Sequence, residues 1–141
     1  MNDLPQALAE LHQEAFETPR PWTVAEFDRL LRDPKTVLCG DGHGFALGRL
    51  VLDEAELLTI AVPKVRRRLG YGAELLTEFL DIMARRGARV CFLEVAETNL
   101  AAFALYQRFD FQVCGRRKSY YVQPDGTTID AVVMTRAIAG R

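Results

Sequence analysis

The sequence has few of the residues on which several kinds of enzyme chemistry depend. Among its 141 residues there are one serine, two histidines and three cysteines. The serine, Ser119, lies outside any G-x-S-x-G turn of the kind that serine hydrolases use. The histidines, His12 and His43, are not spaced as ligands of a zinc ion. We therefore expect neither a serine hydrolase nor a metal site.

The cysteines, Cys39, Cys91 and Cys114, form no C-x-x-C pair, and their odd number argues against a disulfide framework. A reducing compartment, the cytoplasm, is expected. The first residues show no basic segment followed by an apolar core, so no secretory signal is predicted. No apolar run approaches the roughly 20 residues of a membrane span. The net charge of −1 does not favour a nucleic-acid-binding protein.

Length and patterning predict one α/β domain over residues 1–141. Helical periodicity and capping signals predict helices over residues 5–17, 24–32, 70–86 and 99–109. Apolar runs bounded by glycine and proline turns predict strands over residues 36–40, 45–52, 56–62, 89–95, 111–117 and 128–135.

An arginine- and glycine-containing segment joins the third predicted strand to the third predicted helix. Gly70 and Gly72 allow backbone N–H groups to approach a ligand closely, and the helix that follows adds unpaired donors. Together they favour a pyrophosphate-binding loop. The alternative is a tight turn with solvated arginines.

Glu94 is a carboxylate on a strand that is apolar on both faces. It shares one face with Val90 and Phe92, while Cys91 and Leu93 share the other. We therefore expect a central strand that is covered on both sides. Such a carboxylate is either a base whose pKa is raised by burial, or a group at the strand's end that reaches water or an arginine.

Tyr106 lies seven residues after Asn99, two turns along the fourth predicted helix, so the two share a face. Spacing alone favours a core position for Tyr106.

These segments match a known superfamily. Arg67-x-x-Gly70-x-Gly72 resembles the acetyl-CoA loop, Q/R-x-x-G-x-G/A, of the GNAT superfamily of N-acetyltransferases. Other segments resemble its RimI-like members, the ribosomal-protein-alanine acetyltransferases: Pro21-Trp22-Thr23, Leu52 to Leu57, Leu93-Glu94-Val95, Ala104-Leu105-Tyr106, Arg117-x-x-Tyr120-Tyr121 and Asp130 to Met134. The resemblance extends from about residue 4 to residue 135.

The resemblance implies a mixed sheet, splayed at the acetyl-CoA site, with helices on both faces. The strands beside the opening would be 56–62 and 89–95, running parallel. The family's first strand would be missing or truncated here, because only Met1, Asn2 and Asp3 precede Leu4, so one sheet edge would be bare. The family's glycine after the tyrosine helix is Asp110 in this chain, a residue that tolerates left-handed backbone.

The resemblance also implies site residues. Glu94 would be the general base, and Tyr106 the general acid that protonates the departing thiolate. Acetyl-CoA would be bound by Ile60, Ala61, Val62, Arg67, Arg68, Leu69, Gly70, Tyr71, Gly72, Ala73 and Asn99. The acceptor would be bound by Trp22, Tyr120 and Tyr121.

The implied reaction transfers acetyl from acetyl-CoA, without a metal, to a protein N-terminal α-amine: the alanine of small-subunit ribosomal protein eighteen. Freeing an α-amine of pKa about 7.7–8.0 at pH 7 costs about 1 kcal/mol, against about 4.6 kcal/mol for a lysine, and one carboxylate base suits the former. The alternatives are a lysine or small-molecule amine as acceptor and, in another class, a non-catalytic acyl-CoA-binding module. We expect a monomer or weak dimer, with no membrane or nucleic-acid partner.

Overall fold

The computed structural model of the chain describes residues 3–15, 20–66 and 70–138. In chain order its elements are α1 (Leu4–Ala15), α2 (Val24–Arg32), β1 (Thr36–Asp41), β2 (Gly44–Val51), β3 (Glu54–Ala61), the short 3₁₀ helix η1 (Lys64–Arg66), α3 (Tyr71–Arg85), β4 (Val90–Ala96), α4 (Leu100–Arg108), β5 (Gln112–Val122) and β6 (Thr128–Ala137).

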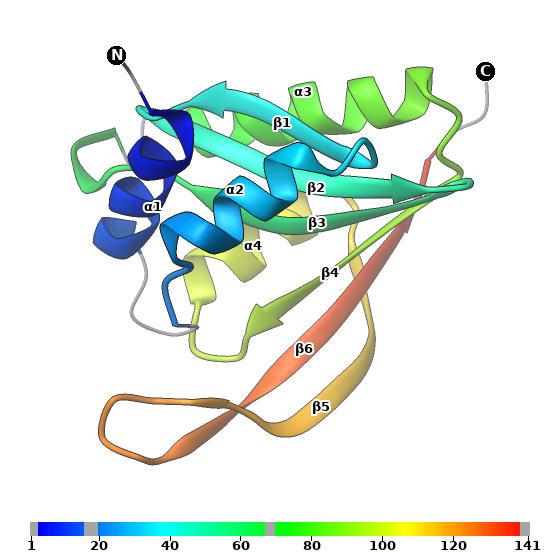
Figure 1. The fold of residues 1–141 in the computed structure, drawn as a ribbon. Helices are drawn as coiled ribbons and strands as arrows, with labels where there is room; N and C mark the ends of the chain where they lie inside the picture. The colour runs from blue at the N-terminus through cyan, green and yellow to red at the C-terminus, as the bar shows by residue number, and fades with distance from the viewer. Residues whose placement is uncertain (1–2, 16–19, 67–69, 139–141) are drawn as a thin grey trace.

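The six strands form one sheet in the order β1-β2-β3-β4-β6-β5 (Figure 1). Neighbouring strands are antiparallel, except β3 and β4, which run parallel. The predicted mixed α/β sheet with a parallel central pair is thereby confirmed. Among the described residues, which begin at Asp3, no strand precedes α1, so β1 is one edge of the sheet and β5 the other.

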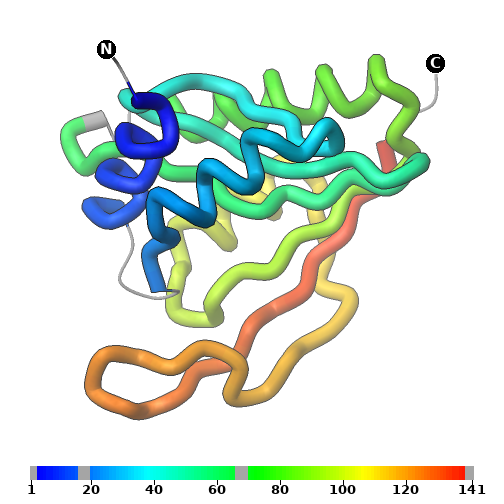
Figure 2. Tube along the Cα trace, viewed as in Figure 1, coloured from blue at the N-terminus to red at the C-terminus, as the bar shows by residue number. Residues whose placement is uncertain are grey.

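Helices pack against both faces of the sheet (Figures 1 and 2). α3 and α4 lie on one face, over a core that includes Phe79 and Leu93. α1 and α2 lie on the other face, over a second core that includes Leu8, Phe27 and Phe45. This second pair crosses the sheet over β1 to β3, and no helix of the described residues lies over β4, β6 and β5 on that side (Figure 2). None of the helices among the described residues is long and apolar enough to cross a membrane.

Local signals set the helix ends. The Thr23 side chain accepts from the Glu26 backbone N–H, and the Glu26 side chain accepts from the Thr23 N–H, which is the predicted capping box of α2. Asn99 caps α4 by accepting from the N–H of Ala102. Asp110 has φ of 68°, so it takes the left-handed turn that the sequence predicts for it. Residues 16 and 17 of the first predicted helix lie outside the described residues.

β5 is longer than predicted. The sequence predicts a strand that ends at residue 117 and a next strand that begins at residue 128, but β5 continues to Val122. It does so because β5 pairs again with β6 at Tyr121 and Val122, after an irregular stretch in the ladder. Tyr120 and Tyr121, which lie between the two predicted strands, therefore belong to β5. The hairpin that β5 and β6 form extends past the helical layers (Figure 1).

Candidate active site

The two central strands separate halfway along their length. β3 pairs with β4 from Glu54 to Leu57, opposite Val90 to Leu93. Beyond these residues β3 stays paired with β2, and β4 stays paired with β6, but the parallel ladder has ended. Figure 1 shows β4 turning away from β3 at this point. The parallel ladder therefore ends in a break, called the opening below, where the facing main-chain edges of β3 and β4 no longer pair with each other and can pair with an extended ligand that carries amide groups.

The amino terminus of α3 lies beside this opening and has the features of an anion-binding helix terminus. Its N-cap, Gly70, has φ of 80°, which a residue with a side chain rarely adopts, and makes no side-chain cap. Gly70 therefore has no side chain to cover the first-turn amides of Gly72 and Ala73, which have no acceptor within the helix. A Cβ at Gly72 would have its nearest contact at 3.5 Å, from Leu105 Cδ2. The predicted residues Arg67, Arg68 and Leu69 lie outside the described residues.

Glu94 stands on β4 beyond the end of the parallel ladder, so its strand borders the opening. Its side chain is 21% exposed, and Arg117 Nε lies 3.0 Å from its Oε1 in an ion pair. Neither Val90 nor Phe92, on the same face, is fully buried, whereas Cys91 and Leu93 on the other face are. The expectation of a central strand covered on both sides is therefore met only in part: the face that carries Val90, Phe92 and Glu94 is half-buried, because α1 and α2 lie over β1 to β3.

Arg117 is not among the site residues predicted from the sequence. A lone carboxylate on an apolar strand signals a basic partner, but the partner's position depends on how β5 lies relative to β4. Among the described residues, Oε2 of Glu94 has no ion pair or hydrogen bond. This oxygen could therefore accept a hydrogen bond from an amine or a water.

Tyr106 lies on α4 and is 7% exposed, inside the core that α3 and α4 share. Its ring meets Phe111 edge to face at 5.9 Å. Burial raises the pKa of the Tyr106 phenol, and Cys91 and Tyr121 raise it further. The phenol is therefore protonated at neutral pH. It is a weaker acid than a thiol of pKa about 8.5, so it suits hydrogen bonding to a thiolate better than complete proton transfer.

Tyr121 connects the two predicted catalytic residues electrostatically. Burial, and then the charge of Glu94, raises the pKa of Tyr121 to about 12, and Tyr121 in turn contributes to the raised pKa of Tyr106. The Tyr120 ring meets the Tyr121 ring edge to face at 5.2 Å, and the Arg117 guanidinium lies 5.3 Å from the Tyr120 ring centroid. Tyr120 and Tyr121 thus lie together beside Arg117, the ion-pair partner of Glu94.

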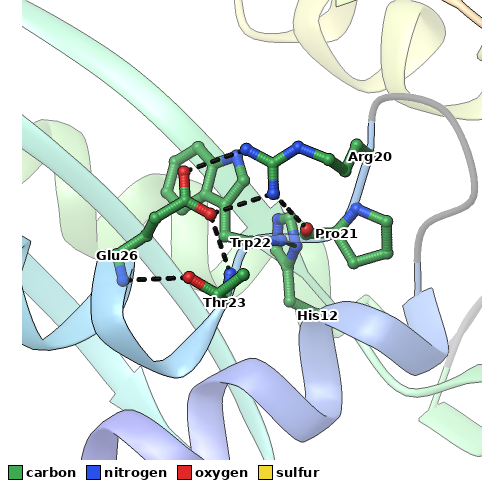
Figure 3. Close-up of polar contacts among 6 residues, drawn as sticks. All are labelled: His12, Arg20, Pro21, Trp22, Thr23 and Glu26. Atoms are coloured by element: carbon green, nitrogen blue, oxygen red, sulfur yellow. Dashed lines mark hydrogen bonds and ion pairs between the residues drawn. The ribbon is translucent and has the colours of Figure 1, made fainter.

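Trp22, the third predicted acceptor residue, makes its described contacts in another cluster. Its ring lies 5.0 Å from the His12 ring and 5.4 Å from that of Phe27, and its backbone N–H donates to Nδ1 of His12. His12 in turn bonds through Nε2 to the Thr59 hydroxyl of β3. Figure 3 shows this segment from the side of α1. Within it, Arg20 donates to the Glu26 carboxylate through both terminal nitrogens, at 2.9 and 3.0 Å.

The described residues contain no group of three or more His, Cys, Asp or Glu side chains that could hold a metal ion. What the site offers is an extended pairing edge, an anion-binding helix terminus, a carboxylate and a protonated phenol. This set suits acyl transfer from a ligand that has an amide-containing arm and a pyrophosphate.

Comparison with known proteins identifies this arrangement. The family model for the Acetyltransferase (GNAT) family matches residues 1–111. The chain belongs to the GNAT family of acetyltransferases. It is an acetyl-CoA-dependent N-acetyltransferase with the family's open mixed sheet.

Individual relatives extend the match over nearly the whole chain. The chain is 36% identical, over 97% of its length and 93% of the relative's, to the [Ribosomal protein bS18]-alanine N-acetyltransferase of Escherichia coli K12. It is 38% identical to the N-alpha-acetyltransferase RimI of Mycobacterium tuberculosis, over 82% of this chain and 77% of that one. The crystal structure of the ribosomal-protein-S18-alanine N-acetyltransferase from Escherichia coli superposes with a TM-score of 0.86, at 32% identity, covering 97% of this chain and 89% of that one.

Proposed function

We propose that this GNAT enzyme transfers acetyl to the α-amine of a protein's N-terminal alanine, and that its acceptor is the small-subunit ribosomal protein bS18. The observation that carries the proposal is the similarity, over 97% of the chain, to an enzyme named for that acceptor. The described site agrees with it, because one partly exposed carboxylate suits an α-amine better than a lysine. An acceptor of this kind also favours the cytoplasm as the location.

The opening and the α3 terminus support an acetyl-CoA site at this place. When bound, acetyl-CoA supplies the acetyl group as a thioester. The main chain of Ile60, Ala61 and Val62 would align its pantetheine arm. The loop from Arg67 to Ala73, Tyr71 included, would hold the pyrophosphate, with donors from the first turn of α3. Asn99 would contact the cofactor beyond β4, while its side chain also caps α4.

Glu94 would act as the general base. Its Oε1 is held by Arg117, and the opposite oxygen, Oε2, would accept the amine proton directly or through one water. Tyr106 would donate a hydrogen bond to the departing sulfur, since its raised pKa keeps the proton on the phenol. Tyr120 and Tyr121 would contact the first residues of the acceptor. Trp22, in the segment that precedes α2, would also contact the acceptor.

Other amines are weaker candidates. An acidic groove would favour a polycation such as a polyamine, and Glu56 is one of the residues that could form it. Yet Glu56 is already paired with Arg49 at 2.8 Å, so its charge is compensated within the protein. The described residues therefore give no specific reason to prefer a polycation.

The first experiment offers acetyl-CoA and two peptides in one tube and locates the acetyl group by mass spectrometry. One peptide begins with a free alanine and follows the sequence of the bS18 terminus; the other has a blocked terminus and internal lysines. Acetyl on the α-amine alone supports the proposal, and acetyl on lysine alone refutes the acceptor class. Lack of transfer to either peptide refutes this acceptor and leaves a small-molecule amine to be tested.

Glu94→Gln tests the base in the same assay. Glutamine keeps the size of the side chain but cannot take up the proton, so we expect kcat at pH 7 to fall by about 10²-fold or more. Acetyl-CoA affinity, measured by calorimetry, should stay within about twofold. Turnover at the wild-type rate would remove Glu94 from this role.

A further inference from the structure

The β5–β6 ladder contains an irregularity beside the predicted acceptor residues. Arg117 pairs with Ala131, and the next pair along β5 joins Tyr121 to Ile129. The three β5 residues between these pairs therefore lie opposite one β6 residue, Asp130. This is a bulge of more than the usual single extra residue, and bulges bend a strand and turn its side chains.

The Asp130 carboxylate holds the bulge in place. Its Oδ1 accepts from the backbone N–H of Ser119 at 2.8 Å. Ser119 has φ of 53°, in the left-handed region that residues with a side chain seldom occupy. The other oxygen, Oδ2, accepts from Arg116 at 3.1 Å, and Arg116 also reaches Glu97 at 2.8 Å. The Ser119 N–H and Arg116 hold the pKa of Asp130 below its usual value, so the group is charged at neutral pH.

The bulge decides how the side chains around it point. In a regular strand, consecutive residues such as Tyr120 and Tyr121 face opposite sides of the sheet. Here their rings touch, with centroids 5.2 Å apart, and the Arg117 guanidinium lies near the Tyr120 ring. Arg117 also forms the ion pair with Glu94. A straightened β5 would separate the two tyrosine rings.

We propose that Asp130 is a positioning residue for the acceptor: by fixing the bulge of β5, it sets Tyr120 and Tyr121 where the acceptor's first residues bind. Asp130 acts through these residues and does not itself contact the reacting atoms. The inference rests on the proposed function, which places the acceptor against Tyr120 and Tyr121 in front of Glu94.

The test measures steady-state kinetics with the alanine-starting peptide, together with thermal melting of each variant. Asp130→Ala removes the acceptor of the Ser119 N–H. A hydrogen bond to a charged group is worth about a factor of 10 or more in an equilibrium constant. We expect the KM for the peptide to rise roughly tenfold, with the KM for acetyl-CoA within about twofold. Asp130→Asn keeps an oxygen for the N–H but loses the charge, so a rise of about threefold is expected.

Two further variants separate the bulge from general stability. Arg116→Gln breaks the ion pair but leaves the Ser119 bond, so the KM for the peptide should stay within about twofold. Ser119→Gly, added to Asp130→Ala, supplies a residue that takes positive φ without strain. The double variant should recover a large part of the lost affinity for the peptide, which a merely structural effect of Asp130 would not allow.

The outcomes separate a failure of the proposed function from a failure of this inference. If the wild-type protein does not acetylate the peptide, the proposed function fails, and this inference fails with it. If the wild-type protein is active but Asp130→Ala leaves the KM for the peptide unchanged, the inference alone is refuted. It is equally refuted if the KM for acetyl-CoA rises as much, or if Ser119→Gly restores nothing. Should Asp130→Ala not melt cooperatively, the comparison of Asp130→Asn with Arg116→Gln decides: equal KM values for the peptide refute the inference.

Discussion

His12 makes the free energy of unfolding depend on pH between about 4 and 6.5. The imidazole is 1% exposed. Its Nδ1 accepts the Trp22 backbone N–H at 3.0 Å, so in the neutral ring the proton is on Nε2, facing the Thr59 hydroxyl at 3.1 Å. Protonation of Nδ1 would set two N–H groups against each other. Burial lowers the pKa of His12 from 6.5 to about 4, against a smaller raising effect of Glu26.

The magnitude follows from the two pKa values. Below pH 6.5 the unfolded chain takes up a proton that the folded protein does not accept until about pH 4, so stability falls as the pH falls through this window. Between pH 7.5 and 4.5 the loss is about 2.5 kcal/mol, a large part of the 5–15 kcal/mol typical of a domain. Arg20 and Thr23 lower the pKa of Glu26 to about 2, so the stability that Glu26 contributes is lost mainly as the pH falls below 4.5.

Urea unfolding at pH 4.5, 5.5, 6.5 and 7.5 measures this dependence. His12→Asn keeps an oxygen for the Trp22 N–H and cannot titrate. Between pH 7.5 and 4.5 its free energy of unfolding should therefore fall by about 2 kcal/mol less than that of the wild type. His43→Asn is the matched control, because the His43 side chain is 76% exposed, and it should follow the wild-type curve. A wild-type curve that is flat between pH 7.5 and 4.5, or that His12→Asn reproduces, would refute the reasoning.

Three other predictions concern catalysis, packing and thiol reactivity. Tyr106→Phe keeps the buried ring but removes the hydroxyl, so kcat should fall at least about tenfold while the melting temperature, measured by calorimetry, changes little. Gly48→Ala should lower the free energy of unfolding in urea by about 1–3 kcal/mol, because its Cβ would collide with the Glu56 carbonyl and the Phe79 ring; Gly115→Ala, whose Cβ would have its nearest contact at 3.8 Å, serves as control. Burial raises the thiol pKa of Cys39 to about 11 and of Cys91 to about 12, so a disulfide reagent at pH 8 should react quickly with exposed Cys114 alone. Cys114→Ser should abolish this fast phase, and urea should expose the other two thiols.

Much of the fold could be predicted because its signals are local. The capping box of α2 lies within four residues, Thr23 to Glu26, and Asn99 and Asp110 act within one turn of α4. The apolar runs of the strands and the glycine turns between them indicate the element order and, with the family resemblance, the parallel central pair. The predicted boundaries therefore agree with the structure to within a few residues, with the end of β5 as the exception.

The site could be predicted only in part. Glu94 and Tyr106 stand out by residue type and by the family pattern, and the charge of Glu94 raises the pKa of Tyr121, which in turn contributes to the raised pKa of Tyr106. Whether Glu94 is enclosed could not be read from its strand, because its exposure depends on how far α1 and α2 extend over the sheet. The Trp22 segment resembles the family's acceptor side, but its contact with His12 requires the packing of α1 against it.

By itself, the sequence determined the elements, their order and the chemistry available on each, since these depend on periodicity, turn residues and side-chain type over short stretches. Tertiary structure alone decided that Arg117 meets Glu94 and that Asp130 holds a bulge in β5. Both depend on β6 lying between β4 and β5 and on a shift in the β5–β6 register. Strand order and register arise from pairing between distant segments, which no local pattern encodes.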